Sequence, residues 1–226
     1  MKPMFIDSTS LPDAWMQAVY QIMKEGKIYT IDRGSYEGHQ RLEFDYITIH
    51  IRHPESEPYI PKLTERYGIP DPASMDYVYQ QYVPYLMTDH KNSNEDYTYG
   101  EFLTPQIPEV IRMFKQDGFG TNQAYMTVGD KKSLMLNDPP CLRGLDCKIK
   151  DGKLHFIVYF RSWDLWGGFP SNLAGLQVLK DYMAYEIGVD TGEIIASSKG
   201  LHLYDYVWGT AKSLFPDKIW DQFVIQ

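Results

Sequence analysis

Apolar residues near the N-terminus recur with the spacing of a helix. Trp15, Val19 and Ile22 stand three or four positions apart, and residues at this spacing share one face of a helix. Ser10 is a typical N-terminal cap, and Gly26 is typical of a position at which a helix ends. The pattern therefore predicts a helix between Ser10 and Gly26 whose apolar face is buried.

Alternation of apolar and polar residues predicts a strand over residues 44–52. Its isoleucines occupy every second position, and Thr48 and His50 stand between them. Since successive side chains of a strand point to opposite faces, one face of this strand is expected to be buried. Similar patterns predict further strands over residues 27–31, 124–128, 147–150, 154–161 and 193–204.

Helical patterns return in three later segments. We predict a helix over residues 76–89, although a proline stands inside it, and a short helix over residues 109–116. A long helix is predicted to begin at Ser171 or Asn172, either of which would cap it, and to run to about Ile187.

A hairpin turn is predicted at Asp151-Gly152, between two of these strands. Strands of the second half are thus connected by a hairpin as well as by helices, which is not the pattern of a doubly wound parallel sheet. No Gly/Ser-rich linker, charge block or low-complexity run divides the chain of 226 residues. We therefore predict an α/β fold of the α+β type: a single domain, residues 1–226, with a mixed, mainly antiparallel β-sheet flanked by helices.

Charge, hydropathy and cysteine content exclude several classes of protein. The formal net charge is −8, whereas nucleic-acid binders usually carry a basic surface, so we expect no nucleic-acid partner. No apolar run approaches the length of a membrane span, so we expect no membrane association. Cys141 and Cys147 are the only cysteines. They form no disulfide framework, which predicts a reducing cytoplasm, and their spacing without a histidine pair predicts no metal.

Cys141 is the candidate nucleophile, because it follows Pro139-Pro140 on a constrained loop. Arg143 stands nearby, and a positive neighbour lowers the pKa of a thiol and increases its thiolate fraction. An isolated cysteine is more often a small buried apolar residue. That is the only interpretation we give to Cys147, which stands in an alternating strand.

Residues that can bind an anion follow the strand that ends at Arg161. Arg161 and Ser162 supply a forked cation and a hydroxyl, and Gly167-Gly168 can expose backbone N–H groups. This combination suits a dianion such as a phosphate. An arginine at a strand end can equally be a solvated residue, and a glycine pair can be a simple turn.

Asn172 can read an amide-bearing ring, because its side chain donates and accepts hydrogen bonds, as the adjacent carbonyl and N–H of uracil require. It can equally be only a helix cap. His202 and Tyr204 occupy alternate positions of a predicted strand and share a face, where they can hold a sugar hydroxyl or pack in the core. With Cys141, these residues indicate covalent chemistry on a pyrimidine nucleotide.

Three motifs in this order resemble the thymidylate synthase family, in particular its compact archaeal-type branch. They are Tyr159-Phe160-Arg161-Ser162-Trp163-Asp164, Gly168-x-Pro170-x-Asn172 and His202-x-Tyr204. The resemblance is good over residues 121–208 and looser before them. It implies a mixed α/β fold, a homodimer joined back to back through its sheets, and reductive methylation of dUMP to dTMP with methylene-tetrahydrofolate as carbon donor and reductant.

The resemblance also implies a role for each candidate residue. Cys141 would be the nucleophile at ring carbon 6, and Tyr99 would assist removal of the carbon 5 proton; Arg161 and Asp164 belong to the same catalytic set. The other roles would be phosphate binding by Arg161, Ser162 and Arg33, recognition of uracil by Asn172, binding of the deoxyribose 3′ hydroxyl by His202 and Tyr204, and contact with the pterin by Asp164 and Gly168.

On the nucleotide side, two positions depart from the family pattern. Thr121-Asn122-Gln123 stands where the family usually has two consecutive arginines that reach the phosphate bound by the partner subunit. Arg143 is a candidate to compensate for them. Leu142 replaces the histidine that usually follows the nucleophile.

The pterin side departs as well. Glu95 and Glu101 are only nearby candidates for the family's glutamate on the folate side, and residues 219–226 do not match its closing tail. The expected carbon donor is therefore methylene-tetrahydrofolate or a related pterin such as methylene-tetrahydromethanopterin.

Two alternatives share part of this chemistry. A pyrimidine deoxynucleotide hydroxymethylase would use the same covalent step but let water intercept the intermediate, so the exclusion of water decides between the two products. A nucleotide-binding homologue without catalysis belongs to a different class, and the presence of both Cys141 and Tyr99 argues against it.

Overall fold

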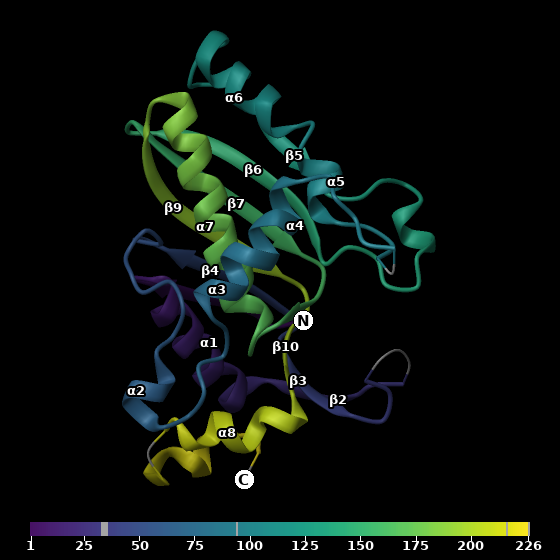
Figure 1. Ribbon diagram of the computed structural model, residues 1–226. Coiled ribbons are helices and arrows are strands. Elements are labelled where there is room, and N and C mark those ends of the chain that lie inside the picture. Colours follow the sequence, from purple (N-terminus) through teal and green to yellow (C-terminus); the bar gives the residue numbers. More distant parts are fainter. Residues whose placement is uncertain (33–35, 94, 216, 226) are drawn as a thin grey trace.

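Two sheets form the framework of the molecule (Figure 1). The computed structural model describes residues 1–32, 36–93, 95–215 and 217–225. Within them, a six-stranded sheet has the order β1-β4-β9-β7-β6-β5, and a four-stranded sheet has the order β2-β3-β10-β8. The strands of the longer sheet are β1 (Pro3–Ser8), β4 (Tyr46–Ile51), β5 (Tyr125–Thr127), β6 (Leu142–Lys150), β7 (Lys153–Phe160) and β9 (Asp190–Ser198). Those of the shorter sheet are β2 (Lys27–Thr30), β3 (Gln40–Glu43), β8 (Trp163–Asp164) and β10 (Leu201–Tyr204).

Helices of very different length surround these sheets. The α-helices are α1 (Leu11–Glu25), α2 (Leu63–Tyr67), α3 (Met75–Tyr77), α4 (Val83–Met87), α5 (Tyr99–Leu103), α6 (Ile107–Gln116), α7 (Gly168–Ile187) and α8 (Trp208–Ser213). A π-helical turn, η1 (Val78–Tyr82), and three 3₁₀ turns, η2 (Ser133–Met135), η3 (Asp205–Val207) and η4 (Asp217–Gln222), complete the described elements. None of the helices in the described ranges is long and apolar enough to cross a membrane.

Both sheets are mixed and mainly antiparallel, as predicted. In the longer sheet, β4–β9, β6–β7 and β5–β6 are antiparallel pairs, while β1–β4 and β7–β9 are parallel. In the shorter sheet, β2–β3 and β3–β10 are antiparallel and β8–β10 is parallel. The hairpin turn between β6 and β7 is confirmed, because Asp151 and Gly152 have φ angles of 52° and 72°, which a type I′ turn requires.

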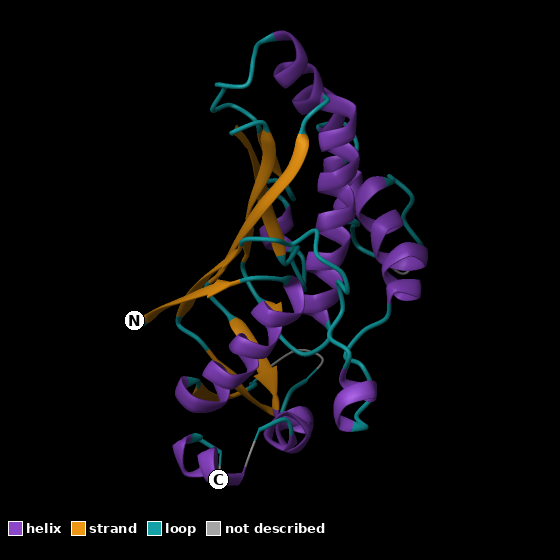
Figure 2. Cartoon of the chain, turned by 90° about the vertical axis from the view of Figure 1, so that its left-hand side faces the viewer, coloured by secondary structure: helices purple, strands orange, loops and turns teal. Residues whose placement is uncertain are grey.

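Helices α1 and α7 cover one face of the longer sheet, and the helices lie on one side of it (Figure 2). Ile47, Ile49 and Ile51 of β4 are fully buried on this face, which confirms the predicted alternation. On the opposite face, His50 is partly exposed and 37% of the surface of Ile157 is exposed to solvent. No helix of the described chain covers that face.

The start of the long helix α7 differs from the prediction. The helix begins at Gly168 with Gly167 as its cap, so neither Ser171 nor Asn172 is the N-cap. The carboxylate of Asp164 accepts hydrogen bonds from the backbone N–H groups of Gly167 at 3.0 Å and Gly168 at 2.8 Å. A carboxylate four residues upstream thus satisfies the N–H groups that a capping residue normally satisfies.

Two predicted elements are interrupted in the structure. The strand predicted over 193–204 is two strands, because the chain leaves the longer sheet after Ser198 and joins the shorter one at Leu201. The helix predicted over 76–89 contains the π-helical turn η1, in which the N–H of Val83 donates to the carbonyl of Val78. Pro84 has no N–H for the regular helical bond, and the wider turn precedes it directly.

Candidate active site

The loop that carries Cys141 is held by Arg161. The backbone N–H of Arg161 donates to the carbonyl of Cys141 at 2.8 Å. The guanidinium Nε lies 3.1 Å from the carbonyl oxygen of Pro139 and 3.3 Å from that of Pro140, and Nη2 donates to Asp138 at 2.6 Å. The end of β7 thereby fixes the two prolines and the cysteine that follows them.

The electrostatic environment of Cys141 differs from the expectation. Burial raises the pKa of the Cys141 thiol, the guanidinium of Arg161 opposes this shift, and Asp138 adds to it. The prediction that Arg143 lowers this pKa is therefore wrong. Arg143 projects from β6 toward the turn at Gly129, where a Cβ on the glycine would lie 3.2 Å from Nη1 of Arg143.

Tyrosines surround the thiol. Tyr99 is buried, and its hydroxyl accepts a hydrogen bond from the backbone N–H of Leu142 at 3.2 Å, so it lies next to Cys141 in the structure. The ring of Tyr99 lies 4.9 Å from Tyr85, 6.1 Å from Tyr97 and 6.5 Å from Tyr82, measured between centroids. Burial raises the pKa of Tyr99 well above its ordinary value.

Sequence reasoning missed Tyr82, Tyr85 and Tyr97 as members of this group. Burial raises the pKa of all three hydroxyls, and a thiolate at Cys141 would raise it further, so they form part of the surroundings of Cys141. The only signal in the sequence is the total of 18 tyrosines, which does not single out these positions.

Asp164, Gly168 and Asn172 meet at the start of α7. Asp164 binds the backbone of Gly168, and a Cβ on Gly168 would lie 3.2 Å from the Cβ of Asp164. Oδ1 of Asn172 accepts the indole N–H of Trp163 at 2.9 Å. Ser162 is half-buried between Arg161 and Trp163.

His202 and Tyr204 share a face of β10, as predicted, and their rings lie 4.7 Å apart. Nδ1 of His202 lies 2.8 Å from the carbonyl oxygen of Gly200, which assigns the hydrogen to Nδ1 and leaves Nε2 as an acceptor. Nε2 is buried without a hydrogen-bond partner among the described residues. Burial lowers the pKa of His202 and raises that of Tyr204 to about 12.

Arg33, expected to bind phosphate, lies outside the described residues. The β2–β3 hairpin around it is anchored beside β10. Tyr36 stacks on Tyr204 with the ring centroids 4.4 Å apart, and Asp205 accepts the backbone N–H of Gln40 at 2.8 Å.

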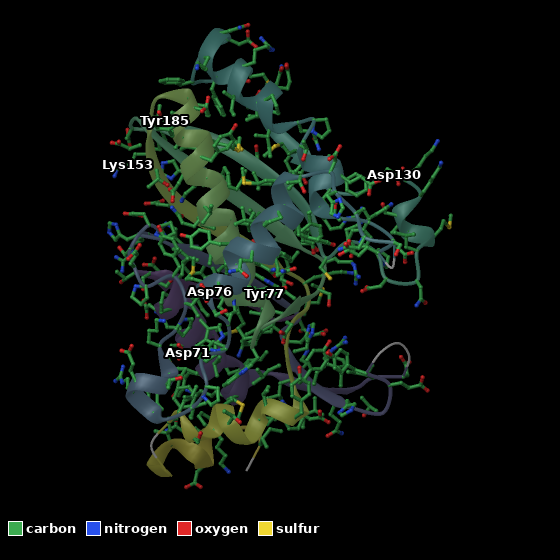
Figure 3. All side chains as sticks on the ribbon, viewed as in Figure 1. Asp71, Asp76, Tyr77, Asp130, Lys153 and Tyr185 are labelled. Carbon is green, nitrogen blue, oxygen red and sulfur yellow. The ribbon has the colours of Figure 1, made fainter. Side chains whose placement is uncertain are left out.

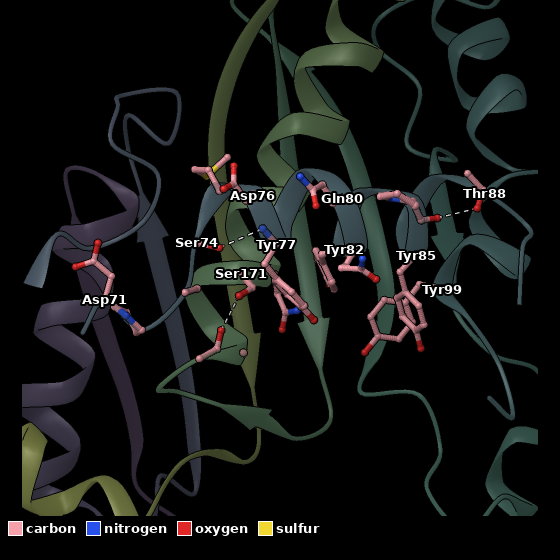
Figure 4. Close-up of a pocket in the computed structure, with 18 of the residues that line it drawn as sticks. Asp71, Ser74, Asp76, Tyr77, Gln80, Tyr82, Tyr85, Thr88, Tyr99 and Ser171 are labelled. Carbon is pink, nitrogen blue, oxygen red and sulfur yellow. Dashed lines mark hydrogen bonds between the residues drawn. The ribbon is translucent and has the colours of Figure 1, made fainter. Parts of the chain in front are cut away.

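A cleft of about 1250 Å³ lies beside these groups. It is lined by residues 71–77, by parts of η1 and α4, by the loop that follows α4, and by the first turns of α7. Figure 3 labels Asp71, Asp76 and Tyr77 on the first of these segments, and Figure 4 shows Tyr85 and Tyr99 side by side in the close-up.

Only part of the predicted set lines this cleft. Tyr99, Gly168 and Asn172 are among its lining residues. The others do not line it and stand in the Cys141 loop, in the link from β7 to β8, in β8 and in β10; they are Cys141, Arg161, Ser162, Asp164, His202 and Tyr204.

The two glutamates differ in position. Glu95 lines the cleft and accepts the backbone N–H of Asn92 at 2.8 Å. Glu101 does not line it and instead pairs with Lys91 at 3.7 Å. Within the described ranges, no group of three or more histidine, cysteine, aspartate or glutamate side chains is placed to hold a metal ion.

The segments that depart from the family pattern lie away from the cleft. Asn122 and Gln123 are exposed in the loop before β5. Phe223 is buried, and the backbone N–H of Val224 donates to the carbonyl of Met23 at 2.8 Å, so the described C-terminal residues pack against α1. None of them lines the cleft.

Comparisons with a family model and with individual proteins point to the same family. The family model described as thymidylate synthase matches residues 83–215. Proteins named "Putative thymidylate synthase" from Methanosarcina mazei and Methanosarcina acetivorans are 30% and 29% identical over 216 and 215 residues, covering 92% of this chain and 93% of theirs. One of the same name from Methanothermobacter thermautotrophicus is 27% identical over 214 residues, covering 88% of this chain and 93% of its own.

Proposed function

The chain belongs to the archaeal-type branch of the thymidylate synthase family of methyltransferases, and we propose that it methylates dUMP to dTMP with a reduced pterin as carbon donor. One observation carries the proposal. Cys141, Tyr99 and Arg161 are joined by hydrogen bonds through the loop before β6, beside a cleft that Asn172 lines.

Each residue has a chemical task in this reaction. The Cys141 thiolate adds to carbon 6 of the uracil ring, which makes carbon 5 nucleophilic. Carbon 5 then bonds to the one-carbon unit, its proton leaves with the assistance of Tyr99, and the pterin is eliminated. Hydride transfer from the pterin completes the methyl group, and the carbon–sulfur bond breaks to release dTMP and the oxidised pterin.

The base of the nucleotide is proposed to lie in the cleft against Asn172, and the rest of the nucleotide between the Cys141 loop and β10. Arg161 and Ser162 bind the phosphate, with Arg33 as a further ligand, and Asn172 recognises uracil. His202 and Tyr204 bind the 3′ hydroxyl; the orphaned Nε2 of His202 supports this assignment, because it is a buried acceptor that needs a donor.

The pterin is proposed to occupy the open part of the cleft near Gly168 and Asp164. A volume of about 1250 Å³ exceeds the usual 300–1,000 Å³ of a small-molecule site, which supports a second substrate beside the nucleotide. Glu95 is the better candidate for the glutamate on this side, since Glu101 lies outside the cleft. Methylene-tetrahydrofolate and methylene-tetrahydromethanopterin are the donors to test.

We also propose that residues 1–226 act as one catalytic domain in a cytoplasmic homodimer. The face of the longer sheet that bears His50 and Ile157 has no helical cover from the described chain, which supports a back-to-back dimer. Both cysteines are free thiols, which supports a reducing compartment.

Release of tritium from dUMP labelled at carbon 5, with product identification by mass, tests this function. Tritium release with dTMP formation is the expected result when either pterin is supplied. Binding of neither dUMP nor a pterin by the folded protein would overturn the proposal.

Hydroxymethylation of the pyrimidine nucleotide is the second candidate function, and the position of the C-terminal residues supports it. The backbone N–H of Val224 donates to the carbonyl of Met23 in α1, and none of the described residues 217–225 lines the cleft, which supports access of water to the site. A hydroxymethyl product in the same assay would establish this alternative.

A further inference from the structure

The amide of Asn172 is held in one orientation by Trp163. The indole N–H of Trp163 donates to Oδ1 of Asn172 at 2.9 Å. An indole N–H can only donate, so the amide oxygen faces the indole and the amide NH₂ group points away from it. Because Asn172 lines the cleft, the orientation of this amide decides which hydrogen-bonding groups a bound ring meets.

Trp163 is itself fixed by aromatic packing. Its ring stacks on Phe160 with centroids 4.1 Å apart and an interplanar angle of 7°, and it contacts Phe169 at 4.5 Å. Only 2% of Trp163 is exposed. The indole N–H is therefore a rigid reference point for the side chain that it binds.

Tyr82 provides a second, independent observation in the same wall. It is 5% exposed and lines the cleft, yet its hydroxyl has no hydrogen-bond partner among the described residues. Burial raises the pKa of Tyr82 well above its ordinary value; the amide of Asn172, which lies within reach of the hydroxyl but makes no hydrogen bond of ordinary geometry to it, opposes the shift, and a charge on Cys141 adds to it. A buried hydroxyl without a partner is unfavourable, and a ligand is a common way to satisfy it.

The position of Tyr82 depends on a glycine in α7. A Cβ on Gly175 would lie 2.4 Å from Cδ1 of Tyr82, which no real side chain tolerates. The absence of a side chain at this position lets the tyrosine ring approach the helix closely. Tyr82 also ends the π-helical turn η1, and such turns are frequent at functional sites.

We propose that Trp163 and Tyr82 determine which pyrimidine the cleft accepts, an inference that rests on the proposed function. Trp163 is a positioning residue that keeps the NH₂ group of Asn172 toward the base, where it donates to the 4-carbonyl of uracil. Cytosine has an amino group at position 4, so two hydrogen-bond donors would face each other and no hydrogen bond would form. Tyr82 binds substrate, and its hydroxyl finds its partner on the base between Asn172 and Cys141.

Trp163→Phe tests the positioning role, because it keeps an aromatic ring between Phe160 and Phe169 and removes the indole N–H. We expect the ratio of the Kd values for dCMP and dUMP, measured by calorimetry, to fall about tenfold, which corresponds to about 1.4 kcal/mol. Trp208→Phe is the matched control, since Trp208 also donates its indole N–H, to the carbonyl of Leu203 at 2.9 Å. An unchanged ratio in Trp163→Phe would overturn this role.

Tyr82→Phe tests the binding role. We expect dUMP to bind about tenfold more weakly, while the Tm of the free protein stays unchanged or rises, because the variant removes an unpaired buried hydroxyl. Tyr185→Phe, at the far end of α7 (Figure 3), should change neither quantity. A lower Tm with unchanged dUMP binding would mean that Tyr82 is only structural.

Nucleotide binding by the wild-type protein distinguishes failure of this inference from failure of the proposed function. If it binds neither dUMP nor dCMP, the proposed function fails and this inference fails with it. If it prefers dUMP and both variants keep the same preference and affinity, this inference alone is overturned.

Discussion

The backbone N–H of Arg161 donates to the carbonyl of Cys141 at 2.8 Å. The side chain of the same arginine binds the carbonyls of Pro139 and Pro140. The proposed phosphate ligand therefore also fixes the loop that presents the proposed nucleophile. Binding of the nucleotide and placement of the thiol are coupled through one residue.

Arg161→Ala should raise the KM for dUMP by about 10- to 100-fold, because a hydrogen bond to a charged group contributes about 1.5–3 kcal/mol. Steady-state kinetics measure this change. Asp138→Asn is the matched variant, because Asp138 occupies Nη2 of Arg161 at 2.6 Å and competes with a phosphate; its KM should not rise. An unchanged KM in Arg161→Ala would place the phosphate elsewhere.

The reactivity of Cys141 should depend on pH in a direction set by its surroundings. Burial raises the pKa of the thiol, Arg161 opposes this, and Asp138 adds to it. Alkylation of the free protein should therefore be slow at neutral pH. Its rate should reach a plateau only at a pH above the ordinary thiol pKa of about 8.5. Arg161→Ala should move the profile to higher pH and Asp138→Asn to lower pH. Shifts in the reverse directions would contradict this assignment.

Cys141→Ala should abolish tritium release from dUMP and leave nucleotide binding measurable, because it removes the nucleophile but none of the proposed phosphate or base ligands. Cys147→Ala is the control, since Cys147 is buried in β6 and has no proposed chemical role. Turnover at the wild-type rate in Cys141→Ala would exclude the covalent mechanism.

Asp164→Ala should destabilise the protein by about 0.5–2 kcal/mol, the range for loss of a helix cap. The carboxylate accepts three hydrogen bonds at the start of α7, from the backbone N–H groups of Trp166, Gly167 and Gly168. Unfolding in urea measures the loss, and Asp164→Asn should retain part of the stability. If Asp164→Ala unfolds at the wild-type urea concentration, the carboxylate does not cap the helix.

Lys180 should make stability depend on pH. It is fully buried, its ammonium group donates to the carbonyl of Gly192, and burial lowers its pKa to about 7. Between pH 7 and 9 the unfolded chain keeps a proton that the folded protein has lost. The free energy of unfolding should therefore rise with pH by at most about 1.4 kcal/mol per unit. In Lys180→Met the free energy of unfolding should not rise with pH in this way. If the free energy of unfolding of the two proteins depends on pH in parallel, Lys180 is not the source of the rise.

Local patterns predicted most elements because each depends on neighbouring residues. The buried face of β4 follows from alternate isoleucines, and the β6–β7 turn follows from Asp151-Gly152. The start of α7 could not be predicted in the same way. The capping group is Asp164, and Asn172, a good cap by type, is instead engaged by Trp163 in the second turn.

The sequence could propose the residues of the candidate site but not the pKa of the Cys141 thiol. The motifs located Cys141, Arg161 and Asn172, but the net effect of burial on the thiol depends on the fold around it. Tyr82 was not predicted because its position depends on Gly175, which is distant in sequence and close in space. Such pairs carry no periodic signal.

Reaction with 5-fluoro-dUMP in the presence of a methylene pterin is the decisive test of covalent catalysis by Cys141, because fluorine at carbon 5 cannot leave as a proton does and the adduct persists. We expect a covalent complex in intact-protein mass spectra, with the nucleotide mapped to the peptide that contains Cys141. If the folded protein binds the fluorinated nucleotide and the pterin without forming this bond, or forms the bond at Cys147, Cys141 is not the nucleophile.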